Sequence, residues 1–326
     1  MIQKLLTIAL TVCALTAGCA QPPVGFYETR SFDGVEFVRR DKTPILMDIF
    51  VPTGAPTPRP AVLILHGGGW AVGDRSYNRD MARFIASMGY TAATADYRLW
   101  PDGGVFPAPV QDTLAAVKFL RKNAADYGID PDRIATCGES AGGHLALMVA
   151  LAKDHSIFED DSYPGIRSDV QAAIDIYGPT EMVPLYEQGG WVVKRLGAGF
   201  VGCPPEECPE KWAAASPITY ARADAPPVLI LHGDMDHVVP YSQAEAMAAA
   251  IRKVGGRCML ARAEGGPHGW GLRFNDVVCQ RTLPVMVDFL RRVFPESCEV
   301  TTQPGNDSAA SDSRSAAIGA ELMDPL

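Results

Sequence analysis

The sequence predicts an α/β fold with a mostly parallel central sheet and helices on both of its faces. Segments with the pattern of strands alternate with segments of helical periodicity, which is the chain order of βαβ units. Residues 61–65 form a continuous apolar run, as expected of a strand buried on both faces. Of the 326 residues, 47% are hydrophobic and 21% charged, which is enough apolar material for one large core.

Eight strands and five long helices are expected in the body of the chain. The helices are recognised by apolar residues three and four positions apart, as at Met81, Phe84, Ile85 and Met88. The strands are predicted at residues 35–39, 45–51, 61–65, 91–96, 133–137, 170–177, 228–232 and 257–261. The helices are predicted at residues 77–88, 109–123, 141–153, 243–254 and 276–293.

One insertion and two terminal segments interrupt this pattern. Residues 178–216 break the alternation, and long segments of this kind often cover an active site, so we expect a small cap. Residues 301–326 are rich in Ser, Ala, Asp and Gly and are predicted to be disordered. The α/β domain itself is assigned to residues 26–300.

The N-terminus has the pattern of an export signal, assigned to residues 1–18. Lys4 precedes an apolar run interrupted only by threonine, which is too short to span a bilayer. The following Leu15-Thr16-Ala17-Gly18-Cys19 resembles a bacterial lipobox, in which Cys19 is lipidated and becomes the mature N-terminus. Cleavage after Ala20 is the alternative. Both readings predict export to the bacterial periplasm or cell envelope, with membrane anchoring in the first.

Six cysteines follow Cys19, in a compartment where disulfides form. Cys203 and Cys208 flank a short Pro-rich loop and are predicted to pair. A zinc site is the alternative, but no second Cys/His pair with ligand spacing lies nearby, so no metal is predicted. Cys137 is expected to be a buried free thiol. Two of the remaining cysteines could also pair, among Cys258, Cys279 and Cys298.

The charge balance excludes some classes of function. The formal net charge is −9, whereas a nucleic-acid-binding surface needs a cationic patch. No apolar stretch of about 18 residues or more follows the N-terminus, so the body is not a membrane-spanning bundle.

Gly138-Glu139-Ser140-Ala141-Gly142 fits the G-x-S-x-G pattern, with a predicted strand before it and an apolar helix after it. In that context the serine lies on a sharp turn, and its hydroxyl is exposed at the helix N-terminus. Glycines on either side prevent clashes with the neighbouring backbone. Ser140 is therefore the candidate nucleophile.

A serine hydroxyl needs a base, and six histidines are available. The chain order Ser, acid, His excludes His66. His268 lies in a Gly-rich loop between the last strand and the last helix, where such a base is expected. The others are interpreted as structural or lack a suitable position: His144, His155, His232 and His237. For the acid, Asp234 and Asp236 both follow the strand at 228–232, and spacing alone does not choose between them.

His66-Gly67-Gly68-Gly69-Trp70 follows the apolar strand at 61–65, as an HGGG oxyanion motif does. Three glycines let backbone N–H groups approach a tetrahedral intermediate. The predicted donors are Gly68, Gly69 and Ala141, the residue after the nucleophile. A phosphate-binding loop is the alternative, but the segment lacks the required lysine and glycine spacing.

The combination resembles the α/β-hydrolase superfamily, and more narrowly the hormone-sensitive-lipase-like carboxylesterases with their bacterial feruloyl and acetyl-xylan esterase relatives. The resemblance implies an α/β-hydrolase fold, no cofactor, and a triad in which Asp236 is the acid. Glu139 and Trp70 favour the feruloyl and acetyl-xylan branch. Asp96 and Arg98 are implied to hold the loop beneath the oxyanion turn. The matching segments are 66–70, 96–99, 106–108, 138–144, 216–220, 232–236 and 267–269.

These features predict an enzyme, a serine carboxylesterase that acts on short-acyl or aryl esters through an acyl-enzyme, with acetyl or feruloyl groups on polysaccharide as candidate substrates. An amidase (arylformamidase-like) or a peptidase would use the same machinery. A long-chain lipase and a non-catalytic α/β-hydrolase binding module are further alternatives. The cap, residues 178–216, is expected to decide the substrate.

Overall fold

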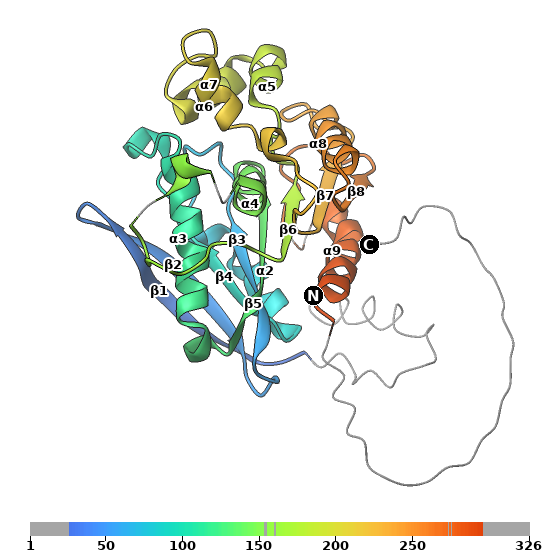
Figure 1. Cartoon of the computed structure of the whole chain (residues 1–326). Coiled ribbons are helices and arrows are strands. Elements are labelled where there is room, and N and C mark those ends of the chain that lie inside the picture. The colour runs from blue at the N-terminus through green and yellow to red at the C-terminus, as the bar shows by residue number, and fades with distance from the viewer. Residues whose placement is uncertain (1–25, 153–154, 160, 273, 275, 296–326) are drawn as a thin grey trace, which may run out of the picture.

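The computed structural model describes residues 26–152, 155–159, 161–272, 274 and 276–295. The predicted signal, Cys19, Cys298 and the predicted tail lie outside these residues. An eight-stranded sheet has the order β1-β2-β4-β3-β5-β6-β7-β8 (Figure 1). β1 and β2 are antiparallel to their neighbours, and all other pairs are parallel. The predicted mostly parallel sheet is confirmed. The strands are β1 (Thr29–Arg40), β2 (Thr43–Pro52), β3 (Arg59–Leu65), β4 (Thr91–Ala95), β5 (Ile129–Glu139), β6 (Ala172–Ile176), β7 (Val228–Gly233) and β8 (Cys258–Ala263).

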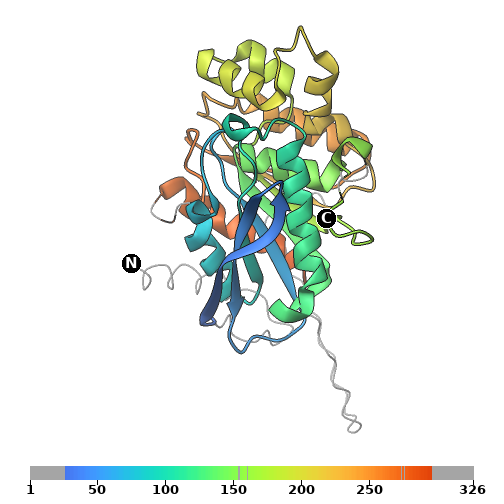
Figure 2. The same ribbon diagram turned by 90° about the vertical axis from the view of Figure 1, so that its left-hand side faces the viewer.

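Helices cover both faces of the sheet (Figure 2). On β3, Leu63 and Leu65 point into one apolar cluster, and Val62 and Ile64 point into the other. This alternation is why the strand reads as a continuous apolar run. The first cluster packs against α3 (Ala108–Lys122), α4 (Ala141–Ala152) and α8 (Ser242–Lys253). The second packs against α2 (Arg79–Ser87) and α9 (Val277–Val293).

The bounds of the helices follow local signals. Asp276 begins α9 as an N-cap, because its carboxylate accepts from the backbone N–H groups of Val278 and Cys279. Pro109 stands in the first turn of α3, where its missing N–H is not needed. All residues of α4 are buried, since the sheet lies on one side and other segments cover the rest. A helix that is apolar all round is expected in such a place.

The cap, residues 178–216, contains α5 (Met182–Gln188), α6 (Trp191–Val201) and α7 (Pro209–Ala214) and lies beyond the carboxyl ends of the parallel strands (Figure 1). A disulfide joins Cys203 to Cys208, with their Cα atoms 6.2 Å apart. The fully buried Trp212 donates its indole N–H to the Cys203 carbonyl at 2.9 Å. The insertion therefore has a small core of its own.

Cys137 and Cys258 are free thiols. Cys137 is buried, as predicted, and its burial raises the pKa of the thiol. Cys258 and Cys279 are not paired with each other. Burial raises the pKa of Cys258 to about 12.

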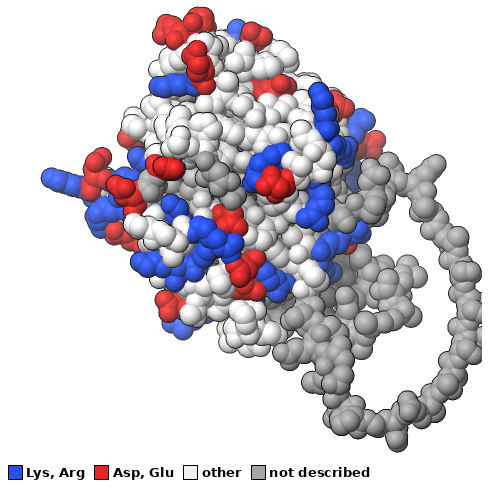
Figure 3. All heavy atoms as spheres, in the orientation of Figure 1, with Lys and Arg blue, Asp and Glu red and all other residues white. Residues whose placement is uncertain are grey.

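On the face shown in Figure 3, acidic and basic side chains are interspersed over the body. Within the described part of the chain, no helix combines the length and the apolar character needed to cross a membrane.

Candidate active site

Ser140 lies on the turn between β5 and α4 with a left-handed φ of 53°. Non-glycine residues rarely adopt this conformation, and it is a known feature of functional turns. Two close approaches require the flanking glycines. A β-carbon at residue 138 would lie 2.3 Å from the Gly142 carbonyl oxygen, and one at residue 142 would lie 2.2 Å from that of Leu65. The serine turn therefore packs closely between the strand and the helix. The Ser140 hydroxyl lies at the N-terminus of α4.

The fold brings His268 and Asp236 to this hydroxyl. The Nε2 atom of His268 lies 3.0 Å from the Ser140 Oγ, and its Nδ1 lies 2.7 Å from the Asp236 Oδ2. The imidazole thus has one nitrogen on the hydroxyl and the other on the carboxylate. This is the arrangement in which Nδ1 donates to the acid and Nε2 is able to accept a proton from the serine.

Asp236 is held as a carboxylate. Its Oδ1 accepts from the backbone N–H groups of Val238 and Val239 at 2.8 and 2.9 Å. Burial alone would raise the Asp236 pKa, but hydrogen bonds from His232 and His268 outweigh it and hold that pKa below its ordinary value. The acid therefore stays ionised through neutral pH.

Asp234, the other candidate acid, binds groups other than His268. Its carboxylate pairs with Arg262 and accepts from the Gly265 backbone N–H at 2.6 Å. It therefore fixes the start of the loop that carries His268. These contacts direct the Asp234 carboxylate away from the imidazole, whereas the Asp236 carboxylate lies on the His268 Nδ1.

Residues 66–70, called here the glycine loop, pass beside the serine. A β-carbon at Gly67 would lie 3.4 Å from the Ser140 β-carbon. Gly68 and Gly69 have φ values of 116° and 59°, which favour glycine. Ala141 is the first residue of α4 and is buried. The three predicted donors thus belong to two segments that meet next to the Ser140 hydroxyl.

The buried rings of His66 and Tyr97 support the glycine loop. The rings of His66 and Tyr97 stack with centroids 4.2 Å apart, and the Tyr97 hydroxyl donates to the His66 carbonyl at 2.9 Å. Burial lowers the pKa of His66, so the ring remains neutral and packs as an apolar surface. The backbone N–H of Trp100 donates to the Trp70 carbonyl at 2.9 Å and fixes the far end of the loop.

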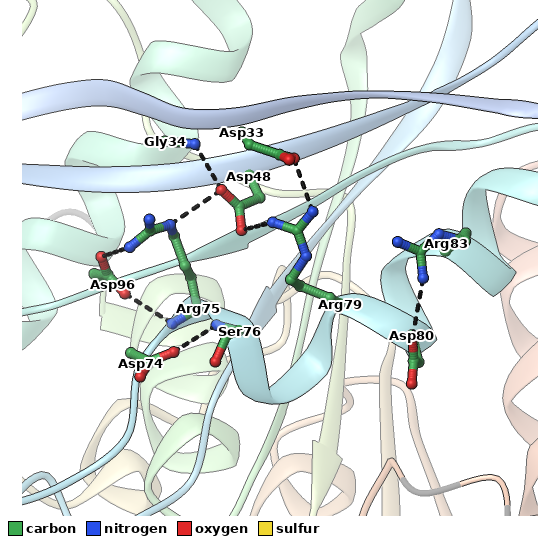
Figure 4. A network of polar contacts seen from close by, with 10 residues as sticks. All are labelled: Asp33, Gly34, Asp48, Asp74, Arg75, Ser76, Arg79, Asp80, Arg83 and Asp96. Carbon is green, nitrogen blue, oxygen red and sulfur yellow. Dashed lines mark hydrogen bonds and ion pairs between the residues drawn. The ribbon is translucent and has the colours of Figure 1, made fainter.

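Charged residues hold the segment that follows the glycine loop (Figure 4). Asp96 accepts from the backbone N–H and the Nη1 of Arg75 at 2.7 and 2.8 Å, which is the structural role implied for it. The Nε of Arg75 donates to Asp48 at 3.0 Å, and the buried Asp48 also pairs with Arg79. Arg98 differs from what the resemblance implies, because its guanidinium binds Asp112 of α3 at 2.7 and 2.8 Å.

The cap closes over the glycine loop through α6. A β-carbon at Gly69 would lie 2.7 Å from the Cδ1 of Leu196. One turn later the ring of Phe200 stacks on Trp70 with centroids 4.2 Å apart. Apolar side chains of the cap therefore lie directly on the segment expected to bind an oxyanion.

Comparison with known families shows to which family the chain belongs. The model of the BD-FAE family matches residues 47–251, which is more than half of the sequence. The chain belongs to the BD-FAE family. This BD-FAE protein is 34% identical over 216 residues to esterase LipQ of Mycobacterium tuberculosis, which covers 64% of the chain and 50% of LipQ. The chain spans about half the length of the curated relatives it matches.

Solved structures confirm the α/β-hydrolase fold of this BD-FAE protein. A truncated carbohydrate esterase from gut microbiota superposes with a TM-score of 0.69 at 25% identity, covering 83% of this chain and 98% of that one. Thermogutta terrifontis esterase 2 phosphonylated by sarin superposes with a TM-score of 0.69 at 27% identity, covering 85% and 98%.

Some residues of the BD-FAE site were not predicted to contribute. Tyr177 places its ring 4.7 Å from that of His268, and its hydroxyl donates to Glu139 at 2.8 Å. Glu139 also accepts from the Leu272 backbone N–H at 3.3 Å, so it links the serine turn to the histidine loop. His232, interpreted as structural, lies 3.5 Å from Asp236. Glu139 carried a sequence signal as part of the G-x-S-x-G motif, and His232 as the first residue of the matching segment 232–236, whereas Tyr177 carried none. Among the described residues, no group of three or more His, Cys, Asp or Glu is placed to hold a metal ion.

Proposed function

We propose that this BD-FAE protein is a serine carboxylesterase that works through an acyl-enzyme. The observation that carries the proposal is the continuous hydrogen-bonded chain from Ser140 through His268 to Asp236, beside a glycine loop. The esterase relatives support the same activity.

The geometry suits each proton transfer. His268 takes the proton of Ser140 at Nε2 while Oγ attacks the ester carbonyl. The negative charge that develops on the carbonyl oxygen is stabilised by the N–H groups of Gly68, Gly69 and Ala141. His268 then gives the proton to the leaving alcohol, and water, activated in the same way, hydrolyses the acyl-enzyme. Asp236 holds the imidazole in position and stabilises the imidazolium without being protonated.

The proposed substrates are short-acyl or aryl esters, with acetyl or feruloyl groups on polysaccharide as the specific candidates. The supporting observation is the contact of Leu196 with Gly69, which places an apolar side chain beside a predicted oxyanion donor. One structural neighbour is named a carbohydrate esterase. The relatives do not favour an amidase, a peptidase or a non-catalytic binding module.

The proposed place of action is the bacterial periplasm or cell envelope, with Cys19 as the lipidated residue. The support is the lipobox-like sequence that ends at Cys19. Mass spectrometry of the N-terminal peptide from the expressed protein tests this. A diacylglyceryl adduct on Cys19 is expected, and an unmodified N-terminus after Ala20 would contradict it.

Hydrolysis of p-nitrophenyl acetate tests the activity. Ser140→Ala is expected to reduce kcat by at least about a thousandfold, because the nucleophile is gone. Ser87→Ala is the matched control, since its hydroxyl donates to the Phe84 carbonyl within α2 and is remote from the site. The wild type is then compared on acetylated xylan, a feruloyl ester, formyl-kynurenine and an anilide. Turnover retained in Ser140→Ala, or a preference for the amides, would overturn the proposal.

A further inference from the structure

A second pair of buried polar residues lies behind Asp236. His232, in β7, has its Nε2 2.8 Å from the Val239 carbonyl oxygen and 3.5 Å from the Asp236 Oδ2. Both neighbours are acceptors, so Nε2 carries a hydrogen. The same Oδ2 receives the hydrogen bond from His268. One carboxylate oxygen thus faces two imidazoles.

The other nitrogen of His232 is without a partner among the described residues. This Nδ1 atom is buried, and so is the Oδ2 of Asp175, which also lacks a hydrogen-bond partner there. The Asp175 Oδ1 accepts from the Gly178 backbone N–H at 2.7 Å. Both side chains are fully buried. Buried polar atoms are nearly always paired, so two unpaired atoms in one region call for an explanation.

Asp175 and His232 lie on the same face of neighbouring strands. β6 and β7 are parallel neighbours (Figure 1). Asp175 is in register with Ile230. Because side chains alternate along a strand, Asp175, Ile230 and His232 point to the same side of the sheet. This is the side covered by α4 and α8, since Ile230 belongs to that cluster.

The raised pKa of Asp175 agrees with a proton that is shared with a neighbouring group. Burial raises the pKa of Asp175 to about 7, and the nearby His232 opposes the rise. Other titratable groups near Asp175 are the Cys137 thiol on β5 and the Cys258 thiol on β8, whose pKa values burial raises. On α4, burial lowers the pKa of His144 to about 4. These three groups are neutral at pH 7 and supply no charge to Asp175, whereas His232 lowers the pKa of Asp175.

We propose that Asp175 and His232 share one proton through one buried water, with the proton on the Asp175 Oδ2, and together position the Asp236 carboxylate. The two unpaired atoms are then satisfied, and the Nε2 hydrogen remains directed at Val239 and Asp236. The inference rests on the proposed esterase function and names two positioning residues for it.

The consequence for the reaction is a fixed carboxylate. Asp236 must keep its Oδ2 on His268 while the imidazolium forms, and a small rotation would misplace the base. Without His232, the Asp236 side chain would be restrained by the backbone N–H groups on Oδ1 and by His268, which is the group that it has to position.

Four variants test the pair. Asp175→Asn keeps an acceptor for the Gly178 backbone N–H and an amide group for the bridging water, whereas Asp175→Ala removes both. His232→Gln keeps an amide donor, whereas His232→Leu does not. We expect kcat, normalised by titration of active sites with an organophosphonate, to fall by on the order of tenfold or more in the Ala and Leu variants. The Asn and Gln variants are expected to stay closer to the wild type, and KM is expected to change little in all four.

A readout other than activity separates positioning from general destabilisation. The proton on the His268 Nδ1, bonded to Asp236, is followed as a low-field resonance in proton NMR. It is expected to shift in Asp175→Ala and His232→Leu. Asp112→Asn is the matched control, because this buried carboxylate pairs with Arg40 and Arg98 instead. It is expected to lower the melting temperature without moving the resonance.

The possible failures are distinct. An unshifted resonance in both Asp175→Ala and His232→Leu, or an Asp175→Asn variant as impaired as Asp175→Ala, overturns the shared proton. A wild-type protein that hydrolyses no ester overturns the proposed function, and the resonance still decides whether the pair acts on Asp236.

Discussion

Leu196 of the cap packs directly against Gly69 of the glycine loop, where a β-carbon at residue 69 would lie 2.7 Å from the Leu196 Cδ1. The obstacle is the end of a side chain, so it can be removed by a second substitution. Gly69→Ala is expected to lower kcat/KM, because the new methyl group pushes the loop and cap apart and also strains a positive φ. Leu196→Ala, added to Gly69→Ala, is expected to restore part of that loss. A double-mutant cycle on p-nitrophenyl acetate measures it.

Gly68 provides the matched control. Its β-carbon would lie 2.0 Å from the Val72 backbone carbonyl oxygen. Since no side-chain change relieves a backbone clash, Leu196→Ala is expected to give no rescue of Gly68→Ala. Equal rescue of both glycine variants, or of neither, would contradict the packing described for α6.

Asp48 is expected to stabilise the segment after the glycine loop. It is buried and faces both Arg75 and Arg79 (Figure 4). Asp48→Asn leaves these guanidinium groups without their shared carboxylate, which should lower the free energy of unfolding by about 3 kcal/mol. Asp33→Asn is the control, because Asp33 pairs with the same Arg79 but is exposed, so a loss under about 1 kcal/mol is expected. Urea denaturation of both variants decides, and equal losses would refute the assignment.

His144 is expected to make the fold sensitive to acid. Its Nε2 lies 2.7 Å from the Ala215 carbonyl, and burial lowers its pKa to about 4. Between about pH 6.5 and pH 4 the unfolded chain binds this proton and the folded chain does not. The stabilisation is therefore fully present above pH 6.5 and is lost as the pH falls, by roughly 3 kcal/mol in total.

The measurement compares the wild type with His144→Gln by denaturant unfolding at pH 7 and pH 4. The variant should lose less stability over this range. Thr136→Val is the control, since it removes a buried hydrogen bond to the Ala146 carbonyl without removing a titratable group. Its difference from the wild type should be the same at both pH values. A His144→Gln variant that behaves in the same way would contradict the prediction.

The disulfide of the cap closes a short loop between α6 and α7. Replacing Cys203 and Cys208 together by Ser is expected to lower the free energy of unfolding by roughly 2 kcal/mol, from the entropy gained by the unfolded chain. Denaturation with and without a reductant measures it. The reductant should shift the wild type toward the double variant and leave the double variant unchanged. A reductant effect on the double variant would point to another source.

The sequence predicted the parts of the site that are encoded locally. Ser140 and the glycine loop sit in short motifs, because a sharp strand-to-helix turn and a close backbone approach both require glycine at fixed positions. The spacing of the sequence could not choose between Asp234 and Asp236. The difference between them depends on the contacts of the Asp234 carboxylate with Arg262 and Gly265. The strand at β1 extends to Thr29, beyond its predicted start, because an edge strand with half-exposed residues lacks a clear apolar pattern.

Contacts between distant segments could not be predicted from the sequence. The position of Leu196 on Gly69 depends on how the cap docks, and the three helices of the cap have no repeating pattern shared with the body. The relation of Asp175 to His232 depends on the register of β6 and β7. Such placements follow from packing of the whole sheet, which is not a property of any local stretch of sequence.

Labelling with a fluorophosphonate, followed by peptide mass spectrometry, tests the central claim most directly. Nucleophilic activation of Ser140 by His268 predicts one adduct per chain, located on Ser140, absent in Ser140→Ala and strongly slowed in His268→Ala. An adduct on another residue, or ester hydrolysis by a wild-type protein that the reagent neither labels nor inhibits, would contradict it.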